Sequence, residues 1–104
     1  MIVAIVTFQL PKPTTLAEIT KTFQATAPKY QGMAGLLRKN YILSEDGRRA
    51  GGVYVWNSRA DADRVYTPEW KAFVKDKYGS APQIEYLNSP VMVDNRDGTI
   101  KVAA

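Results

Sequence analysis

The chain of 104 residues contains neither histidine nor cysteine, and these two absences exclude several classes of enzyme. Histidine is the commonest metal ligand and the usual general base near neutral pH. Without it, the chain cannot build a histidine-ligated haem site, a hydrolytic zinc centre or a nucleophile activated by an imidazole. Without cysteine, it has neither disulfides nor thiolate chemistry, and we expect a reducing, cytoplasmic location.

Long apolar runs and nucleotide-binding loops are missing as well. The apolar residues 1–8, MIVAIVTF, lack a basic leader and fall short of the roughly 20 residues that a membrane span needs. We therefore predict a buried strand there. The chain has no G-x-G-x-x-G and no Walker loop. The carboxylates Asp61, Asp63 and Glu69 are dispersed, so we expect no metal site.

The composition is that of one folded domain. With 45% hydrophobic and 23% charged residues, no segment is polar enough to predict disorder. Domains most often contain about 100 to 150 residues, and the chain shows no repeat or linker. We predict a single domain over residues 1–104, with a short C-terminal arm at about residues 95–104. This arm could form a strand, contact a partner or remain a loose tail.

Apolar periodicity predicts the order strand, helix, strand, strand, helix, strand. Thr15 with Glu18, and Ser58 with Asp61, form capping signals at the two helix starts. Thr67-Pro68 interrupts the second helix. The expected strands are residues 2–8, 36–43, 52–56 and 82–93, and the expected helices are residues 15–27 and 58–79. This order predicts the ferredoxin-like α+β fold, an antiparallel four-stranded sheet with both helices on one face.

The two central strands form a predicted hairpin with two different faces. If the loop is residues 46–49, Tyr41 pairs with Tyr54 and Lys39 with Trp56. A bulge at the two adjacent glycines in the second strand would break this register. Because side chains alternate along a strand, one face then carries Leu37, Lys39, Tyr41, Tyr54 and Trp56.

The first strand and this hairpin carry large apolar side chains on both faces. Helices cover only one face of a ferredoxin-like sheet, and the other face would expose more apolar surface than soluble monomers usually tolerate. We predict that a second copy covers it through a two-fold symmetric, sheet-to-sheet contact. The expected assembly is a homodimer.

Part of the hairpin and its flanks resembles a known family. The residues that carry the resemblance are Gly35-Leu36, Lys39, Tyr41 and residues 50–56, AGGVYVW. They resemble the small dimeric α+β barrel proteins of the YdhR type, within the wider antibiotic-biosynthesis-monooxygenase-like group. The resemblance extends from the first strand to about Asn95. The chain departs from the family pattern at Tyr41, where tryptophan is expected, and at the Thr67-Pro68 break.

The resemblance implies a cofactor-independent monooxygenase that acts on a small electron-rich aromatic compound, such as a phenol or an anthrone-like molecule. Lys39 would stabilise an oxyanion, and Tyr41 or Tyr54 would form a hydrogen bond with the substrate oxygen. No residue is an obvious strong base. The substrate-binding residues would be Trp56, Trp70, Phe73 and Leu37.

Each of these assignments has a simpler alternative. Aromatic residues at strand and helix spacing usually pack in a core or an interface, and a lysine in mid-strand often extends to solvent. A non-catalytic dimer that binds small ligands would need the same pocket and no additional motif.

A nucleic-acid partner is a further alternative, because the net charge is +4 and RNA-recognition motifs share this order of elements. In that motif the stacking aromatic residues occupy about the third and fifth places of one strand signature. Counted from Arg49, these places hold Gly51 and Val53. We therefore expect no nucleic acid and no membrane as partners, but a second copy and a small aromatic molecule.

Overall fold

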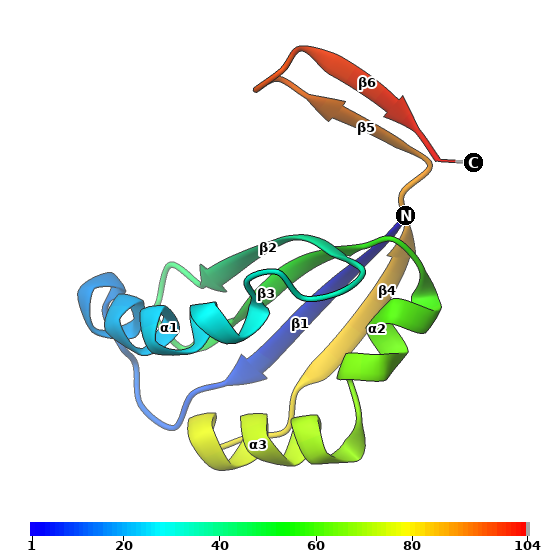
Figure 1. Cartoon of the computed structure of the whole chain (residues 1–104). Helices are drawn as coiled ribbons and strands as arrows, with labels where there is room; N and C mark the ends of the chain where they lie inside the picture. Colours follow the sequence, from blue (N-terminus) through cyan, green and yellow to red (C-terminus); the bar gives the residue numbers. More distant parts are fainter. Residues whose placement is uncertain (104) are drawn as a thin grey trace.

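The computed structural model describes residues 1–103 and confirms the ferredoxin-like α+β fold. A four-stranded antiparallel sheet has the strand order β2-β3-β1-β4, and helices cover one of its faces (Figure 1). A separate two-stranded hairpin follows. The elements are β1 (Ile2–Gln9), α1 (Leu16–Tyr30), β2 (Leu36–Leu43), β3 (Arg49–Trp56), α2 (Arg59–Val65), α3 (Pro68–Tyr78), β4 (Gln83–Asn88), β5 (Val91–Asp94) and β6 (Thr99–Val102).

Side-chain caps fix the three helix starts. The hydroxyls of Thr15, Ser58 and Thr67 each accept a hydrogen bond from a backbone N–H three residues later, at 3.2 Å. Pro68 occupies the first turn of α3, where its missing N–H removes no helical hydrogen bond. The Thr67-Pro68 break thus separates α2 from α3 as predicted, because a new helix begins there.

Helix α1 continues past its predicted end at Ala27 and includes Pro28. A proline inside a helix removes one backbone hydrogen bond, and the helix was therefore predicted to end before Pro28. The last turn forms nevertheless, because Tyr30 is buried and its hydroxyl accepts a hydrogen bond from Trp70 Nε1 at 3.0 Å. Tertiary packing therefore overrides the local preference.

The predicted register between β2 and β3 is wrong by two residues. Lys39 faces Tyr54, and Tyr41 faces Gly52. The turn extends from residue 44 to residue 49, because the Asp46 carboxylate accepts hydrogen bonds from Ser44 Oγ at 2.7 Å and from the Arg48 N–H at 3.0 Å. A shift by an even number of residues preserves which side chains share a face. Lys39, Tyr41 and Tyr54 therefore share one face, as predicted, and that face is the one that the helices cover.

The pairing of β2 with β3 contains a bulge, but the bulge lies in β2, between Leu36 and Arg38, and not at Gly51-Gly52. Leu37 is the extra residue and is 50% exposed. The glycines remain in regular pairing with β1. A Cβ added to Gly51 would overlap the Val6 carbonyl oxygen of the neighbouring strand, so the close approach of β1 and β3 requires glycine there.

The core lies between the sheet and the helices. Ala4, Val6 and Phe8 of β1 point toward the helices, and Trp56 at the end of β3 is fully buried. The Trp56 Nε1–H donates a hydrogen bond to Tyr66 Oη at 3.1 Å, so the indole has no unpaired polar atom. Burial and hydrogen bonding together fix the aromatic layer on this face.

The opposite face of the sheet carries a row of aliphatic side chains that no element of residues 1–103 covers. Val3 is aligned with Val55 on one side and with Leu87 on the other. Ile5 is similarly aligned with Val53. We call this surface, made of Val3, Ile5, Val53, Val55 and Leu87, the open face.

The last predicted strand, residues 82–93, is divided at Ser89-Pro90. The Ser89 N–H donates a hydrogen bond to the Met1 carbonyl at 2.9 Å, and the chain then leaves the sheet. β5 and β6 pair with each other and project away from the domain (Figure 1). Four of their aliphatic side chains are 52% to 74% exposed: Val91, Val93, Ile100 and Val102. The predicted arm at residues 95–104 forms the outer part of this hairpin, and Ala104 lies outside the described residues.

The close approach of β1 and β3 predicts the effect of two glycine substitutions. Gly51→Ala should lower the free energy of unfolding by more than about 3 kcal/mol, because the new methyl group meets backbone that cannot move aside. Gly32→Ala is the control, since it meets nothing within 4 Å and adds only the strain of a φ of 71°. We expect a loss of about 1 to 2 kcal/mol there. Equal losses in urea denaturation would contradict the β1–β3 register.

Candidate functional site

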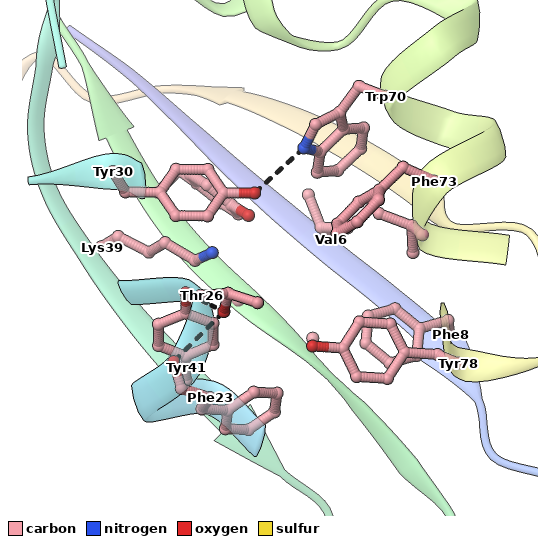
Figure 2. A pocket seen from close by; sticks show the side chains of 14 residues that line it. Val6, Phe8, Phe23, Thr26, Tyr30, Lys39, Tyr41, Trp70, Phe73 and Tyr78 are labelled. Carbon is pink, nitrogen blue, oxygen red and sulfur yellow. Dashed lines mark hydrogen bonds between the residues drawn. The ribbon is translucent and has the colours of Figure 1, made fainter. Parts of the chain in front are cut away.

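A cavity opens between the sheet and the helices α1 and α3, and Lys39 extends into it from β2 (Figure 2). Its volume is about 20 Å³, enough for one or two water molecules. The surrounding side chains are mostly aromatic, and none of them is a carboxylate. The walls that matter most to the chemistry are Tyr30, Tyr41, Tyr54, Trp70 and Phe73.

The amine of Lys39 lies among three aromatic rings. Its Nζ is 3.4 Å from the centroid of the Tyr30 ring, 3.8 Å from that of Tyr41 and 4.6 Å from that of Tyr54. Among residues 1–103, Lys39 forms no ion pair. The rings attract a cation through their negative faces, but they replace water poorly. The site therefore holds an amine that no counter-ion neutralises.

Burial, and secondly the nearby charge of Lys29, lowers the pKa of Lys39 to about 7. Lys29 lies just outside the cavity, with its Nζ 4.5 Å from the Phe73 ring centroid and 5.9 Å from that of Tyr30. Near neutral pH a large part of the Lys39 population is thus the free amine, which can accept a proton. The sequence offered no obvious base, and the structure makes Lys39 a candidate for one.

The tyrosines whose rings surround this amine also carry hydroxyl groups that can form hydrogen bonds. Burial raises the pKa of Tyr41 and that of Tyr54, so both hydroxyls keep their protons at neutral pH. The Tyr41 hydroxyl lies 2.7 Å from Thr26 Oγ1. Tyr30 Oη accepts a hydrogen bond from Trp70 Nε1. These bonds hold the rings in place, and the hydroxyls can donate to a bound oxygen.

Five of the seven predicted site residues line this cavity: Lys39, Tyr41, Tyr54, Trp70 and Phe73. Trp56 does not, because its indole stacks behind the Tyr54 ring, with the ring centroids 5.9 Å apart, and points to Tyr66. Leu37 lies on the bulge and lines an outer groove between α1 and β2, with a volume of about 280 Å³. Tyr30, Lys39 and Tyr41 line both spaces and so form the wall between the groove and the cavity.

The sequence did not identify Tyr30, Thr26 or Lys29 as site residues. Pro28 suggested that the helix had ended, so the residues after it were assigned to a connection. A signal was present, because Tyr30 follows Phe23 by seven residues and extends the apolar stripe of the helix. Continuing that stripe through the proline would have placed Tyr30 on the buried face.

No group of three or more acidic side chains converges among residues 1–103 in a way that could hold a metal ion. No helix in this part of the chain is long and apolar enough to cross a membrane.

The lowered pKa of Lys39 predicts a pH dependence of stability. Between about pH 7 and pH 10 the unfolded chain holds a proton on this lysine that the folded chain has released, so the free energy of unfolding rises with pH. In Lys39→Met this rise should be absent. Urea denaturation at pH 7 and about pH 9.5 measures the difference, with the exposed Lys71→Met as the control. Parallel pH curves for Lys39→Met and the wild type would show that the amine has an ordinary pKa.

Neither a family profile nor a curated protein sequence matches this chain. Solved structures do match. A monooxygenase from the gene ActVA-Orf6 of Streptomyces coelicolor, in complex with the ligand nanaomycin D, has a TM-score of 0.63 and 18% identity, covering 85% of this chain and 86% of its own. A proposed antibiotic biosynthesis monooxygenase from Bordetella bronchiseptica has a TM-score of 0.61 and 17% identity, covering 85% of this chain and 95% of its own.

A third structure, Rv0793 from Mycobacterium tuberculosis, has a TM-score of 0.59 and 16% identity, covering 86% of this chain and 95% of its own. At identities this low, the similarity establishes the shared fold and leaves the function to be argued from the site itself. The chain therefore has the fold that these three proteins share.

Proposed function

We propose that this chain is a cofactor-independent monooxygenase that acts on a small electron-rich aromatic compound of the phenol or anthrone class. The observation that carries the proposal is the position of the Lys39 amine inside an aromatic cavity that no carboxylate lines. The fold agrees with it, since one neighbour is a monooxygenase in complex with the ligand nanaomycin D and another is a proposed antibiotic biosynthesis monooxygenase. A chain without cysteine suits the cytoplasm, where we place this activity.

The chemistry needs no metal or flavin if the substrate itself supplies the electrons. A deprotonated anthrone gives one electron to O₂, and the resulting carbon radical and superoxide combine to a hydroperoxide. Loss of water from the hydroperoxide leaves a ketone. Overall, a CH₂ group and O₂ give C=O and H₂O. The protein's part is to bind the substrate, remove its proton and exclude water.

Lys39 performs two of these tasks in the proposal. Its free amine accepts the substrate proton, and the ammonium so formed stabilises the anion that remains. The hydroxyl of Tyr41 or Tyr54 donates a hydrogen bond to the substrate oxygen. Trp70 and Phe73 form apolar walls that exclude water from the reacting atoms.

The substrate needs more room than the interior cavity offers, because small-molecule sites usually measure about 300 to 1,000 Å³. The outer groove, at about 280 Å³, lies near the lower end of that range and contains Leu37. We propose that the aromatic ring of the substrate rests in this groove against Leu37 and that its oxygen reaches Lys39. Phe73, which is 41% exposed, lines the interior cavity and not the groove.

We also propose that the functional unit is a homodimer that covers the open face. Its central aliphatic row, Val55, Val3 and Leu87, runs across three strands, and such a surface favours burial against a complementary copy. In the next row, Val53 and Ile5 are aligned with Glu85 of β4. The exposed side chains of β5 and β6 would add an arm that reaches the partner.

Oxygen uptake by purified, metal-stripped protein tests the activity against a panel of anthrone-like and polyphenolic compounds, with autoxidation in buffer subtracted. We expect saturable uptake whose rate rises with pH through about 7, as Lys39 loses its proton. Lys39→Met should lower the rate by about 10² or more, since this is the usual contribution of a general base.

The control for this assay is Lys71→Met, which removes an exposed lysine from α3. It should retain the wild-type rate. If no compound increases uptake above autoxidation but several raise the melting temperature, the chain is instead a ligand-binding protein with this fold. Uptake that is equal in wild type and Lys39→Met would remove Lys39 from the mechanism.

Sedimentation velocity at micromolar concentration tests the homodimer. Val55→Glu introduces a charge into the middle of the open face, and we expect it to convert a dimer to a folded monomer. Lys75→Glu on the exposed side of α3 is the matched control and should remain dimeric. A wild-type protein that sediments as a monomer with a cooperative melt would rule out the assembly.

A further inference from the structure

We propose that Lys39 is also a nucleophile and condenses with small anionic carbonyl compounds, such as 2-keto acids, to form an imine. This activity uses the same cavity as the proposed oxygenation, but it needs neither oxygen nor an oxidisable substrate. It rests on three observations: the surroundings of the amine, its access to solvent and the position of a second cation.

The surroundings of Lys39 leave its nitrogen lone pair available. Its Nζ lies over ring faces rather than beside an acceptor, and it forms neither a hydrogen bond nor an ion pair within residues 1–103. The ionisable side chains around it are Lys29 on α1 and three tyrosines that face it with their rings: Tyr30 on α1, Tyr41 on β2 and Tyr54 on β3. No carboxylate lines the cavity to hold the amine as an ammonium ion.

The amine can also be reached from outside. In the described part of the chain, every side-chain nitrogen or oxygen atom that is buried from solvent has a hydrogen-bond partner. Because the Lys39 Nζ has no such partner, it keeps some contact with solvent. The outer groove and the cavity meet at this side chain. A small carbonyl compound can therefore approach along the groove.

Lys29 supplies the preference for an anion. The two amines contact the same aromatic ring, since the Lys39 Nζ is 3.4 Å and the Lys29 Nζ is 5.9 Å from the Tyr30 centroid. A cation beside a desolvated lysine keeps that lysine unprotonated, and it also attracts a negatively charged substrate. Lys29 is exposed and free to contact a carboxylate. The small cavity favours a compound of few carbon atoms.

The condensation is balanced without any other reagent. The Nζ lone pair forms a bond to the carbonyl carbon, and the electron pair of the C=O π bond moves to oxygen, which takes a proton to give a carbinolamine. Loss of that hydroxyl as water produces the imine. In total, an amine and a carbonyl group give an imine and one water molecule, with no change in oxidation state. The hydroxyl of Tyr41 or Tyr54 lies on the same sheet face and can donate the proton to the oxygen.

Reductive trapping tests the proposal. The whole chain is incubated with pyruvate and cyanoborohydride at pH 7 without oxygen, and peptide mass spectrometry locates the adduct. We expect one adduct, on Lys39, that forms at least about tenfold faster than any on exposed Lys71. Lys39→Arg keeps a cation but has no primary amine, and it should show no adduct at this position.

Lys29→Gln separates the role of the second cation from that of the amine. It should slow trapping of pyruvate severalfold while changing that of neutral acetaldehyde less. An equal effect on both compounds would contradict the anionic preference. Adducts distributed evenly over exposed lysines, or none on Lys39, would overturn the proposal.

Because trapping is performed without oxygen, its outcome is separate from that of the oxygen-uptake assay. Failure of trapping together with Lys39-dependent oxygen uptake would remove the imine and leave the oxygenase. Trapping on Lys39 without any oxygen uptake would remove the oxygenase and leave the imine.

Discussion

The hydrogen bond from Trp70 Nε1 to Tyr30 Oη joins the end of α1 to α3, and the geometry of the cavity depends on it. It anchors the last turn of α1 beyond Pro28, where a helix would otherwise tend to end. The Tyr30 ring is thereby held over the Lys39 amine. Without this link the Tyr30 ring would no longer cover the amine, which would keep only its contacts with the rings of Tyr41 and Tyr54.

The burial of Lys39 is unfavourable to the fold, and this suggests that it serves another purpose. Removing an ammonium from water costs more than the ring faces return, since each cation–π contact contributes about 0.5 to 2 kcal/mol. The lowering of the Lys39 pKa reflects this burial first and the nearby charge of Lys29 second. An aliphatic side chain would fill the same space without the cost of removing an ammonium from water. Strained electrostatics of this kind concentrate at functional sites, where a protein gives up stability for reactivity.

The sequence predicted the order of the elements as far as β4 and the grouping of Lys39, Tyr41, Tyr54 and Trp56 on one face of the hairpin, but Leu37 leaves this group because of the bulge. Both depend on local patterns. Lys39 and Tyr54 stay on the same face of the sheet after any shift of register by an even number of residues. The actual register depends on hydrogen bonds of Asp46 in the turn, and the bulge at Leu37 depends on packing between strands. Neither leaves a periodic signal in the sequence.

The candidate site was predicted only in part, because a contact between distant parts of the chain positions one of its residues. Lys39, Tyr41 and Tyr54 belong to one hairpin, so strand alternation was enough to group them. Tyr30 reaches the amine only because a distant tryptophan holds it. That contact joins residues 40 positions apart in the chain, and no local rule predicts it.

The C-terminal hairpin has a consequence for how the molecule would behave in solution. Among residues 1–103, β5 and β6 pack extensively only on each other, and an isolated two-stranded hairpin is at best marginally stable in water. Its backbone amides should therefore exchange with solvent almost as fast as those of an unfolded peptide unless something outside the chain holds them. Hydrogen exchange in β5 and β6 would report on association, while exchange in β1 and β3 would report on global unfolding.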